Sequence, residues 1–213
     1  MRLRRFCAVA VVMLITLAVA CGGKSSATFT PSVEVTGASS APRSTAPADG
    51  ASASHSAATA SQGKAGHTFE SKSKGYSVTY PTGWTVQENG ASLLGFEADV
   101  FLAPADSGFS PNVNILCDKH GGGLASDDYL QASLNAFKSL NINVKTGDAV
   151  QVGGAKSKLV TYTASSMNQP LDFAQLYLTD ARCGWVLTLT TKSGDRDEYM
   201  DVFLNMAKTF TLQ

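Results

Sequence analysis

Two cysteines, Cys117 and Cys183, carry the first chemistry that this sequence suggests, because each lies in a segment of alternating apolar residues. Cys117 is in phase with Ile115 and Cys183 with Trp185, so both thiols are expected on the apolar face of their strands. If these strands are antiparallel neighbours, the end of one lies beside the start of the other. We therefore predict a Cys117–Cys183 disulfide. It would close a loop of about 67 residues and stabilise the fold by about 4 kcal/mol in the chain-entropy model.

Metal binding is the alternative use of these residues. Cys117 and His120 are three positions apart, and Cys183 would be a third ligand. A zinc site needs four protein ligands, or three and an open position, and the sequence has no second Cys and His pair. We predict no metal site, and two free buried thiols stay the other alternative to the disulfide. The three glycines at 121–123 lack the Gly-Lys-Ser/Thr ending of a phosphate-binding loop and are predicted to form a flexible connection.

The other polar side chains do not suggest a catalytic set. His67 lies at the edge of the predicted domain, which leaves His120 as the one histidine placed for acid–base work. Asp127 and Asp128 are predicted to stabilise the start of a helix. A later acidic group has the same explanation, with a weak calcium site as its alternative; it consists of Asp195, Asp197, Glu198 and Asp201. We expect no catalytic residue, no cofactor and no enzyme activity.

Cys21 follows a segment that is typical of an export signal. Three arginines precede an apolar stretch over residues 6–20, and small residues lead up to the cysteine. Fifteen residues reach only about 22 Å as a helix, short of the roughly 30 Å hydrocarbon core of a bilayer. The run Leu17-Ala18-Val19-Ala20-Cys21 resembles a bacterial lipobox, in which the cysteine becomes the acylated first residue. We predict a lipoprotein signal peptide over residues 1–20 and lipid attachment at Cys21, with an ordinary signal peptide as the alternative.

Composition divides the rest of the chain into two parts. Residues 22–66 contain 35 Ala, Ser, Gly, Thr or Pro among 45. Such a segment buries too little apolar surface to order itself, so we predict a lipidated cysteine and a disordered tether over residues 21–66. Residues 67–213 are predicted to form one domain, with 11 basic and 15 acidic side chains. The whole chain has 17 of each, which argues against a strongly basic nucleic-acid binder.

The predicted domain alternates between strand-like and helix-like segments. Strands are expected at 76–80, 99–103, 113–117, 143–152, 158–163, 173–178 and 185–191. Helical spacing predicts one helix over 127–140, capped by Ser126 or Asp127, and a second helix opened by a capping box from Asp195 to Glu198. Tyr76, Tyr80 and Trp84 are expected in the core, with a ligand groove as the alternative. Short connections favour antiparallel pairing, so the predicted fold class is α+β, an antiparallel β-sheet packed with two main α-helices.

Three motifs give this order of elements a family resemblance. Residues 76–84 read YSVTYPTGW, Val152-Gly153-Gly154 leads into a strand, and Gln175-Leu176-Tyr177-Leu178 precedes Trp185 and the closing helix. Over about residues 69–212 the chain resembles the PsbP/Mog1-like superfamily, which includes bacterial lipoproteins of the LpqN or DcrB type. The resemblance implies an α/β/α sandwich and a binding or assembly role without a common catalytic set. Because one fold serves many functions, it predicts no particular partner.

These observations together predict a function class. We expect an extracytoplasmic lipoprotein, anchored to the cell membrane or an outer membrane, whose PsbP-like domain supports an envelope protein, polymer or lipid. In that compartment disulfides persist. The alternatives are a carrier or sensor of a small apolar or lipidic ligand and, third, an envelope enzyme. No nucleic-acid partner is expected.

Overall fold

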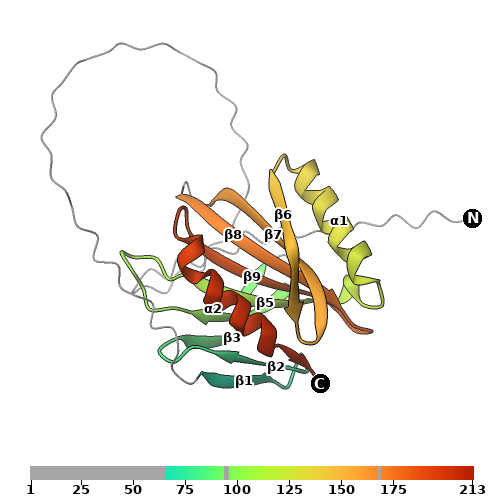
Figure 1. The fold of residues 1–213 in the computed structure, drawn as a ribbon. Helices are drawn as coiled ribbons and strands as arrows, with labels where there is room; N and C mark the ends of the chain where they lie inside the picture. Colours follow the sequence, from blue (N-terminus) through green and yellow to red (C-terminus); the bar gives the residue numbers. More distant parts are fainter. Residues whose placement is uncertain (1–65, 94–95, 167–168) are drawn as a thin grey trace, which may run out of the picture. The chain divides into compact units, whose positions relative to one another are not determined.

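The computed structural model of this chain describes residues 66–93, 96–166 and 169–213 (Figure 1). The predicted signal peptide, Cys21 and the tether lie outside the described residues. The elements are β1 (His67–Ser71), β2 (Tyr76–Tyr80), β3 (Thr85–Leu93), β4 (Phe96–Leu102), β5 (Asn112–Asp118), the 3-10 turn η1 (Lys119–Gly121), α1 (Ser126–Ser139), β6 (Val144–Val152), β7 (Ala155–Ser166), β8 (Gln169–Thr179), β9 (Gly184–Lys192), α2 (Arg196–Thr209) and β10 (Thr211–Leu212).

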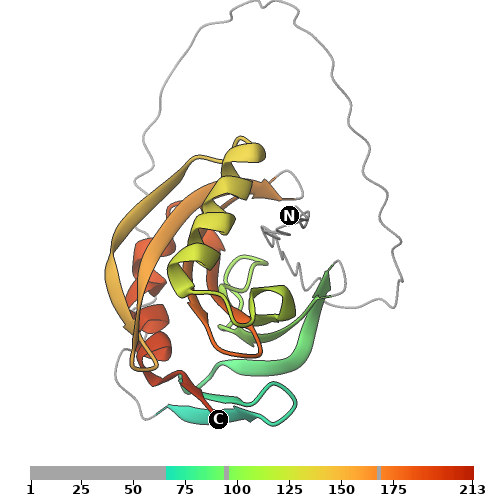
Figure 2. The same cartoon turned by 90° about the vertical axis from the view of Figure 1, so that its right-hand side faces the viewer.

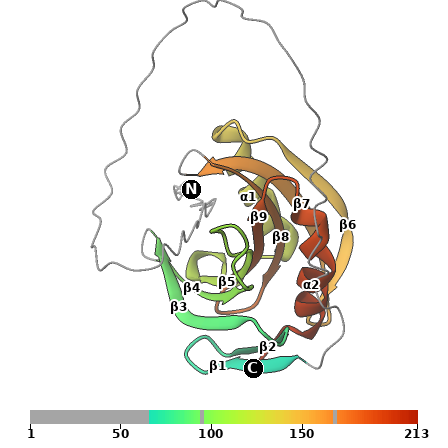
Figure 3. The ribbon, with the colours of Figure 1, turned by 90° about the vertical axis from the view of Figure 1, so that its left-hand side faces the viewer.

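The strands form two sheets in which neighbouring strands are antiparallel. The larger sheet has seven strands in the order β3-β4-β5-β9-β8-β7-β6, and the smaller has three in the order β1-β2-β10. The larger sheet is curved, and α1 and α2 lie on its opposite faces (Figures 2 and 3). The predicted α+β class, an antiparallel sheet packed with two helices, is confirmed.

Strand alternation divides the interior into two cores. On β5, Ile115 packs into the core shared with α2 and the smaller sheet, whereas Leu116 packs into the core beneath α1. On β9, Leu187 and Val186 divide in the same way. Because the side-chain period of a strand is two, each central strand supplies both cores at once. Tyr76 belongs to the α2 core, as predicted.

A buried ion pair joins the smaller sheet to the larger one. Asp99 on β4 is fully buried, and its carboxylate lies 2.7 Å from the ammonium group of Lys74, in the β1–β2 turn. The Tyr76 hydroxyl donates to the same carboxylate at 2.6 Å, and the backbone N–H of Asn89 donates to it at 2.8 Å. These bonds satisfy the buried charge and fix the smaller sheet against β3 and β4.

Several local predictions are wrong in detail. Strands β1, β3 and β10 were not predicted, and β7 and β8 are longer than predicted. The first residue of α1 is Ser126, but its hydroxyl bonds to Thr179 across the fold instead of capping the helix. Asp195 is the N-cap residue of α2 without a side-chain capping bond, so the predicted capping box does not form.

No helix among the described residues is both long enough and apolar enough to cross a membrane.

The buried ion pair gives a stability prediction. Replacing Lys74 by Met leaves the Asp99 carboxylate without its counter-charge in the interior, which typically costs about 3 kcal/mol. Urea denaturation measures the change. Lys72→Met is the matched control, because Lys72 lies in the same turn and is exposed, so its effect should stay within about 0.5 kcal/mol. Equal stability of the two variants would contradict the role of the pair.

Candidate functional site

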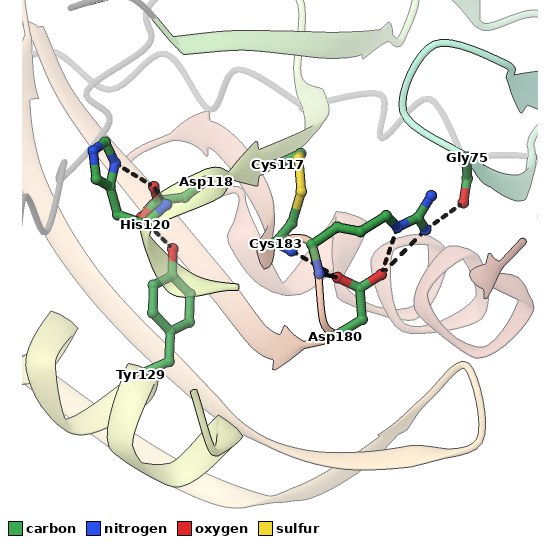
Figure 4. Close-up of a disulfide and its surroundings, with 8 residues drawn as sticks. Gly75, Cys117, Asp118, His120, Tyr129, Asp180 and Cys183 are labelled. Atoms are coloured by element: carbon green, nitrogen blue, oxygen red, sulfur yellow. Dashed lines mark hydrogen bonds and ion pairs between the residues drawn. A yellow bond between two sulfur atoms is a disulfide. The ribbon is translucent and has the colours of Figure 1, made fainter. Parts of the chain in front are cut away.

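Three residues that the sequence analysis singled out, Cys117, His120 and Cys183, lie near one another where β5 ends and β9 begins (Figure 4). Cys117 lies opposite Trp185 in the β5–β9 pairing, and Cys183 immediately precedes β9. The two cysteines form a disulfide with their Cα atoms 5.3 Å apart. Both belong to the core on the α2 side, where Cys183 is buried and Cys117 is partly buried. The predicted disulfide is present, because the alternation along the strands places both cysteines on the same face of the sheet.

The alternative Cys and His ligand set is not assembled. Both sulfur atoms are joined to each other, so neither is a thiolate available to a metal. His120 instead directs its Nδ1 atom to Asp118. Within the described part of the chain, no three His, Cys, Asp or Glu side chains gather as a metal site.

Asp118 is the polar residue at this edge that sequence reasoning missed. It is 4 % exposed and accepts three hydrogen bonds: from the Tyr129 hydroxyl at 3.1 Å, from the His120 backbone N–H at 2.9 Å and from His120 Nδ1 at 3.1 Å. Its position could have been read from β5, since it follows Leu116 in phase on the face toward α1.

The Asp118 contact gives His120 a defined orientation. When Nδ1 carries the proton donated to Asp118, the lone pair lies on Nε2, and 73 % of the side chain is exposed. Among the described residues, no serine, threonine or cysteine side chain is hydrogen-bonded to His120. The pair therefore positions a base or a hydrogen-bonding group at the surface, without the nucleophile of a catalytic triad.

Two of the three glycines after His120, Gly121 and Gly122, lie in close contact with the segment from Arg182 to Gly184. Gly121 lies in η1 against β9, and a β-carbon there would approach the Gly184 Cα within 2.6 Å. A β-carbon on Gly184 would in turn lie 2.4 Å from the Tyr129 ring. Glycine is needed because the two backbones and the ring leave no room for a side chain.

Asp180 organises the turn from β8 to β9 beside the disulfide. Its carboxylate accepts the backbone N–H groups of Cys183 at 2.7 Å and Arg182 at 2.8 Å. Partial burial alone would raise the pKa of Asp180, but these bonds and the Arg182 guanidinium hold it below its usual value. Arg182 also donates to the carbonyl of Gly75 in the β1–β2 turn at 3.3 Å. The turn thus connects the two sheets at the edge where the disulfide closes.

The remaining predicted residues lie away from this edge or within the cores. Asp127 and Asp128 are in the first turn of α1, and Asp197 and Glu198 are in the first turn of α2, where carboxylates favour the helix dipole. Tyr80 and Trp84 are partly buried against the α2 core, in agreement with the core prediction. Cys21 lies outside the described residues.

Comparison with known proteins gives structural neighbours alone. No protein-family model matches the chain, and no curated protein matches it. A Bacteroides thetaiotaomicron structure is 14 % identical with a TM-score of 0.48, covering 70 % of this chain and 49 % of its own, so this chain spans about half of that protein. LpqN of Mycobacterium tuberculosis, described as involved in cell envelope biogenesis, is 15 % identical with a TM-score of 0.47, covering 71 % of this chain and 87 % of its own. Cyanobacterial PsbP from Synechocystis is 15 % identical with a TM-score of 0.41, covering 72 % and 96 %.

Two of these neighbours are of the LpqN and PsbP types that the sequence analysis named. At such identities the likeness concerns the fold, and it assigns no ligand, partner or activity to this chain.

The disulfide gives the first prediction for this edge. Replacing Cys117 and Cys183 together by Ser should lower the free energy of unfolding by about 4 kcal/mol, because the chain without the cross-link gains entropy when unfolded. Urea denaturation measures this, with Cys21 also replaced by Ser and the signal segment omitted. Reduction of the matching Cys117–Cys183 protein is the control and should give the same loss. Two alkylatable thiols after denaturation without reductant would contradict the disulfide.

Buried tyrosines give a pH prediction. Burial, and then the Asp118 carboxylate, raises the pKa of Tyr129, and burial likewise raises the pKa of Tyr76, Tyr162 and Tyr177. Unfolded phenols ionise near pH 10. The unfolded chain then releases protons that the folded chain keeps, so stability is present below about pH 10 and falls above it.

We therefore expect phenolate absorbance from these four tyrosines to rise together with the loss of the far-ultraviolet circular dichroism signal. Tyr129→Phe should make the alkaline loss of stability less steep. Phenolate absorbance equivalent to all six tyrosines in a chain with native circular dichroism would disprove the expectation.

Proposed function

We propose that this protein is a lipid-anchored extracytoplasmic accessory protein, whose α+β domain binds another component of the cell envelope without catalysing a reaction. The observation that carries the proposal is the order of three segments along the sequence: a lipobox-like run ending at Cys21, 45 residues rich in small amino acids, and a folded domain. A domain held in this way acts within a fixed distance of a membrane.

The tether supports a role in reaching a partner. A flexible coil of 45 residues has a root-mean-square end-to-end distance of somewhat under 40 Å, and we propose this reach for residues 22–66. Tethering raises the effective concentration of the domain near the membrane, so a weak interaction with an envelope partner suffices.

The charge balance supports anchoring by lipid instead of by electrostatics. Without residues 1–20 the chain has 14 basic and 17 acidic side chains, a net charge of −3. An anionic bilayer surface does not attract such a chain. Several acyl chains together give durable attachment, because each buried methylene contributes about 0.8 kcal/mol.

The geometry of the disulfide edge supports a binding role over an enzymatic one. His120 and Asp118 form the one oriented base described above, and the groups around them are bonded within the fold: Tyr129 to Asp118, and Asp180 to Arg182. These contacts stabilise the fold, so the groups that make them are already occupied and do not surround His120 with further reactive side chains.

A fractionation experiment tests the anchor. The wild-type protein should stay in the membrane fraction after a high-salt wash, whereas Cys21→Ser should be released because it lacks the acylated residue. Cys7→Ser is the matched control, since Cys7 lies inside the apolar segment, and it should behave as wild type. Firm membrane association of Cys21→Ser would overturn the lipoprotein proposal.

Crosslinking in intact cells tests the accessory role. A photoreactive residue at position 140, where Leu140 is 57 % exposed, should give a product of defined mass that is lost in Cys21→Ser and weakened when the tether is shortened. Products unchanged by both alterations would count against a partner at the membrane. Turnover of an envelope substrate by the purified protein would replace the proposal with the enzyme alternative.

A further inference from the structure

An asparagine followed by a glycine lies in β3, at one edge of the larger sheet. Asn89-Gly90 is the only such pair in the sequence. Because glycine has no β-carbon, its backbone nitrogen approaches the side chain of the preceding residue with little hindrance. When that nitrogen attacks the amide carbon of an asparagine, the amide nitrogen leaves as ammonia. The pair is therefore a candidate site of chemical modification, and its surroundings decide whether the reaction is favoured.

Strand register places this pair in an irregular part of the sheet. The paired positions of β3 with β4 stop at Gln87 and resume at Ala91, so residues 88–90 lie opposite Asp99 alone. Such a bulge interrupts the ladder of backbone hydrogen bonds. Among the strands that the structure describes, β4 is also the one hydrogen-bonded neighbour of β3. Local opening is easiest where few bonds must break, so the backbone around Asn89 can move while the sheet stays folded.

The shape of the bulge explains why these two residue types stand here. The backbone of Asn89 is left-handed, with a φ of 51°, a conformation in which asparagine is several-fold enriched among residues with a side chain. A β-carbon on Gly90 would lie 2.5 Å from the β-carbon of Gln87 and 2.9 Å from its carbonyl oxygen. Packing against Gln87 thus requires a glycine directly after Asn89.

Lys74 contacts the amide group that would react. Its ammonium group donates to Asn89 Oδ1 and is held by the Asp99 carboxylate at 2.7 Å. The Lys74 side chain is only 10 % exposed, so the fold fixes its position, whereas Asn89 is exposed to water.

This contact favours attack on the Asn89 amide. A positively charged donor on the amide oxygen makes the amide carbon more electrophilic. It also stabilises the negative charge that develops on the oxygen when a nucleophile adds to that carbon. The bulge therefore combines an unhindered nucleophile, the Gly90 nitrogen, with an activated carbon and access of water.

We propose that Asn89 is a site of spontaneous deamidation assisted by Lys74. The backbone nitrogen of Gly90 bonds to Asn89 Cγ and loses its proton, and the Cγ–Nδ2 bond breaks to release ammonia. The product is a cyclic succinimide. Solvent water then adds to either ring carbonyl and opens the ring, which leaves aspartate or isoaspartate at position 89. The inference goes beyond the proposed accessory function, because it assigns a modification site and holds whether or not the protein is anchored.

The reaction alters the contact that joins the smaller sheet to the larger one, where β2 runs beside β3 (Figure 3). A new carboxylate at position 89 lies beside Lys74, so one ammonium group then faces two carboxylates. In isoaspartate the main chain also passes through the side-chain carbonyl and is longer by one methylene group. This change displaces the backbone N–H of position 89 that donates to Asp99. We therefore expect the isoaspartate form to be less stable than the unreacted chain.

Ageing of the folded chain tests the site. The mature chain carrying Cys21→Ser is kept folded at neutral pH in water enriched in heavy oxygen, and its peptides are then analysed by mass spectrometry. Asn89 should be converted, with uptake of labelled oxygen, at least tenfold faster than Asn141. Asn141 is the matched internal control: it is exposed and left-handed, with a φ of 56°, but it precedes Ile142, whose side chain hinders the attack. Equal rates, or no labelled oxygen at position 89, would overturn the proposal.

Lys74→Met tests the assistance by the ammonium group. Under conditions where circular dichroism shows a folded chain, this variant should convert Asn89 about tenfold more slowly, a smaller effect than the loss of a buried oxyanion donor because water also reaches this amide. Lys72→Met is the control and should react like the parent. An equal or faster rate in Lys74→Met would overturn the role of Lys74. If the variant does not fold, a synthetic peptide of residues 85–93 replaces it, and faster conversion of the peptide than of the folded parent would overturn the assistance.

Unfolding of the separated products tests the structural consequence. The aged chain is divided by ion exchange, since each product carries one more negative charge than the unreacted chain. The isoaspartate form should unfold at a lower urea concentration than both the unreacted chain and Asn89→Asp, which has the charge without the longer main chain. Equal urea midpoints for all three would overturn the expected weakening of the contact between the sheets.

Discussion

The pairing of β5 with β9 at the centre of the larger sheet is the interaction on which the rest of the structure depends. Each of these strands supplies side chains to both cores, so a shift of one residue in their register would exchange the two faces. The disulfide beside Asp118 and the close contact of Gly121 with Gly184 both lie at one end of this pairing. They hold the register where the covering elements meet the sheet.

Two buried carboxylates attach the smaller sheet and α1 to the larger sheet. Asp99 accepts the hydroxyl of Tyr76 from the smaller sheet, and Asp118 accepts the hydroxyl of Tyr129 from α1. In each case a tyrosine contributes apolar area to a core and a polar atom to a buried charge. The two faces are therefore connected to the sheet by similar chemistry, although one carboxylate has a lysine and the other a histidine beside it.

The sequence predicted the parts of the fold in which one physical signal dominates. Alternation located the central strands, and the phase of Cys117 and Cys183 predicted their disulfide. Helical spacing located α1 and α2. The signal fails where several demands overlap: β8 is buried on both faces along most of its length, so its sequence does not alternate cleanly, and β3 contains a register shift between Gln87 and Ala91.

Long-range bonds explain the local errors at the helix starts and at the disulfide edge. Ser126 bonds to Thr179, 53 residues away in sequence, so its capping preference is overridden by a tertiary contact. The hydrogen bond between Asp118 and Tyr129 likewise forms only because α1 places Tyr129 over Asp118. Such partners become known only when the chain is folded, and a single sequence does not contain that information in any periodic form.

The strand order also has a consequence for how the chain reaches this structure. The larger sheet consists of two meanders of sequential hairpins, β3 to β5 and β6 to β9, each built from neighbouring segments of the chain. They meet only where β5 pairs with β9, at a sequence separation of 66 residues between the two bonded cysteines. Local hairpins form quickly, whereas distant pairing must first overcome the entropy of closing the intervening chain. We therefore expect the joining of the two meanders to be the slowest topological step of folding, and the Cys117–Cys183 disulfide holds the two meanders together once it has formed.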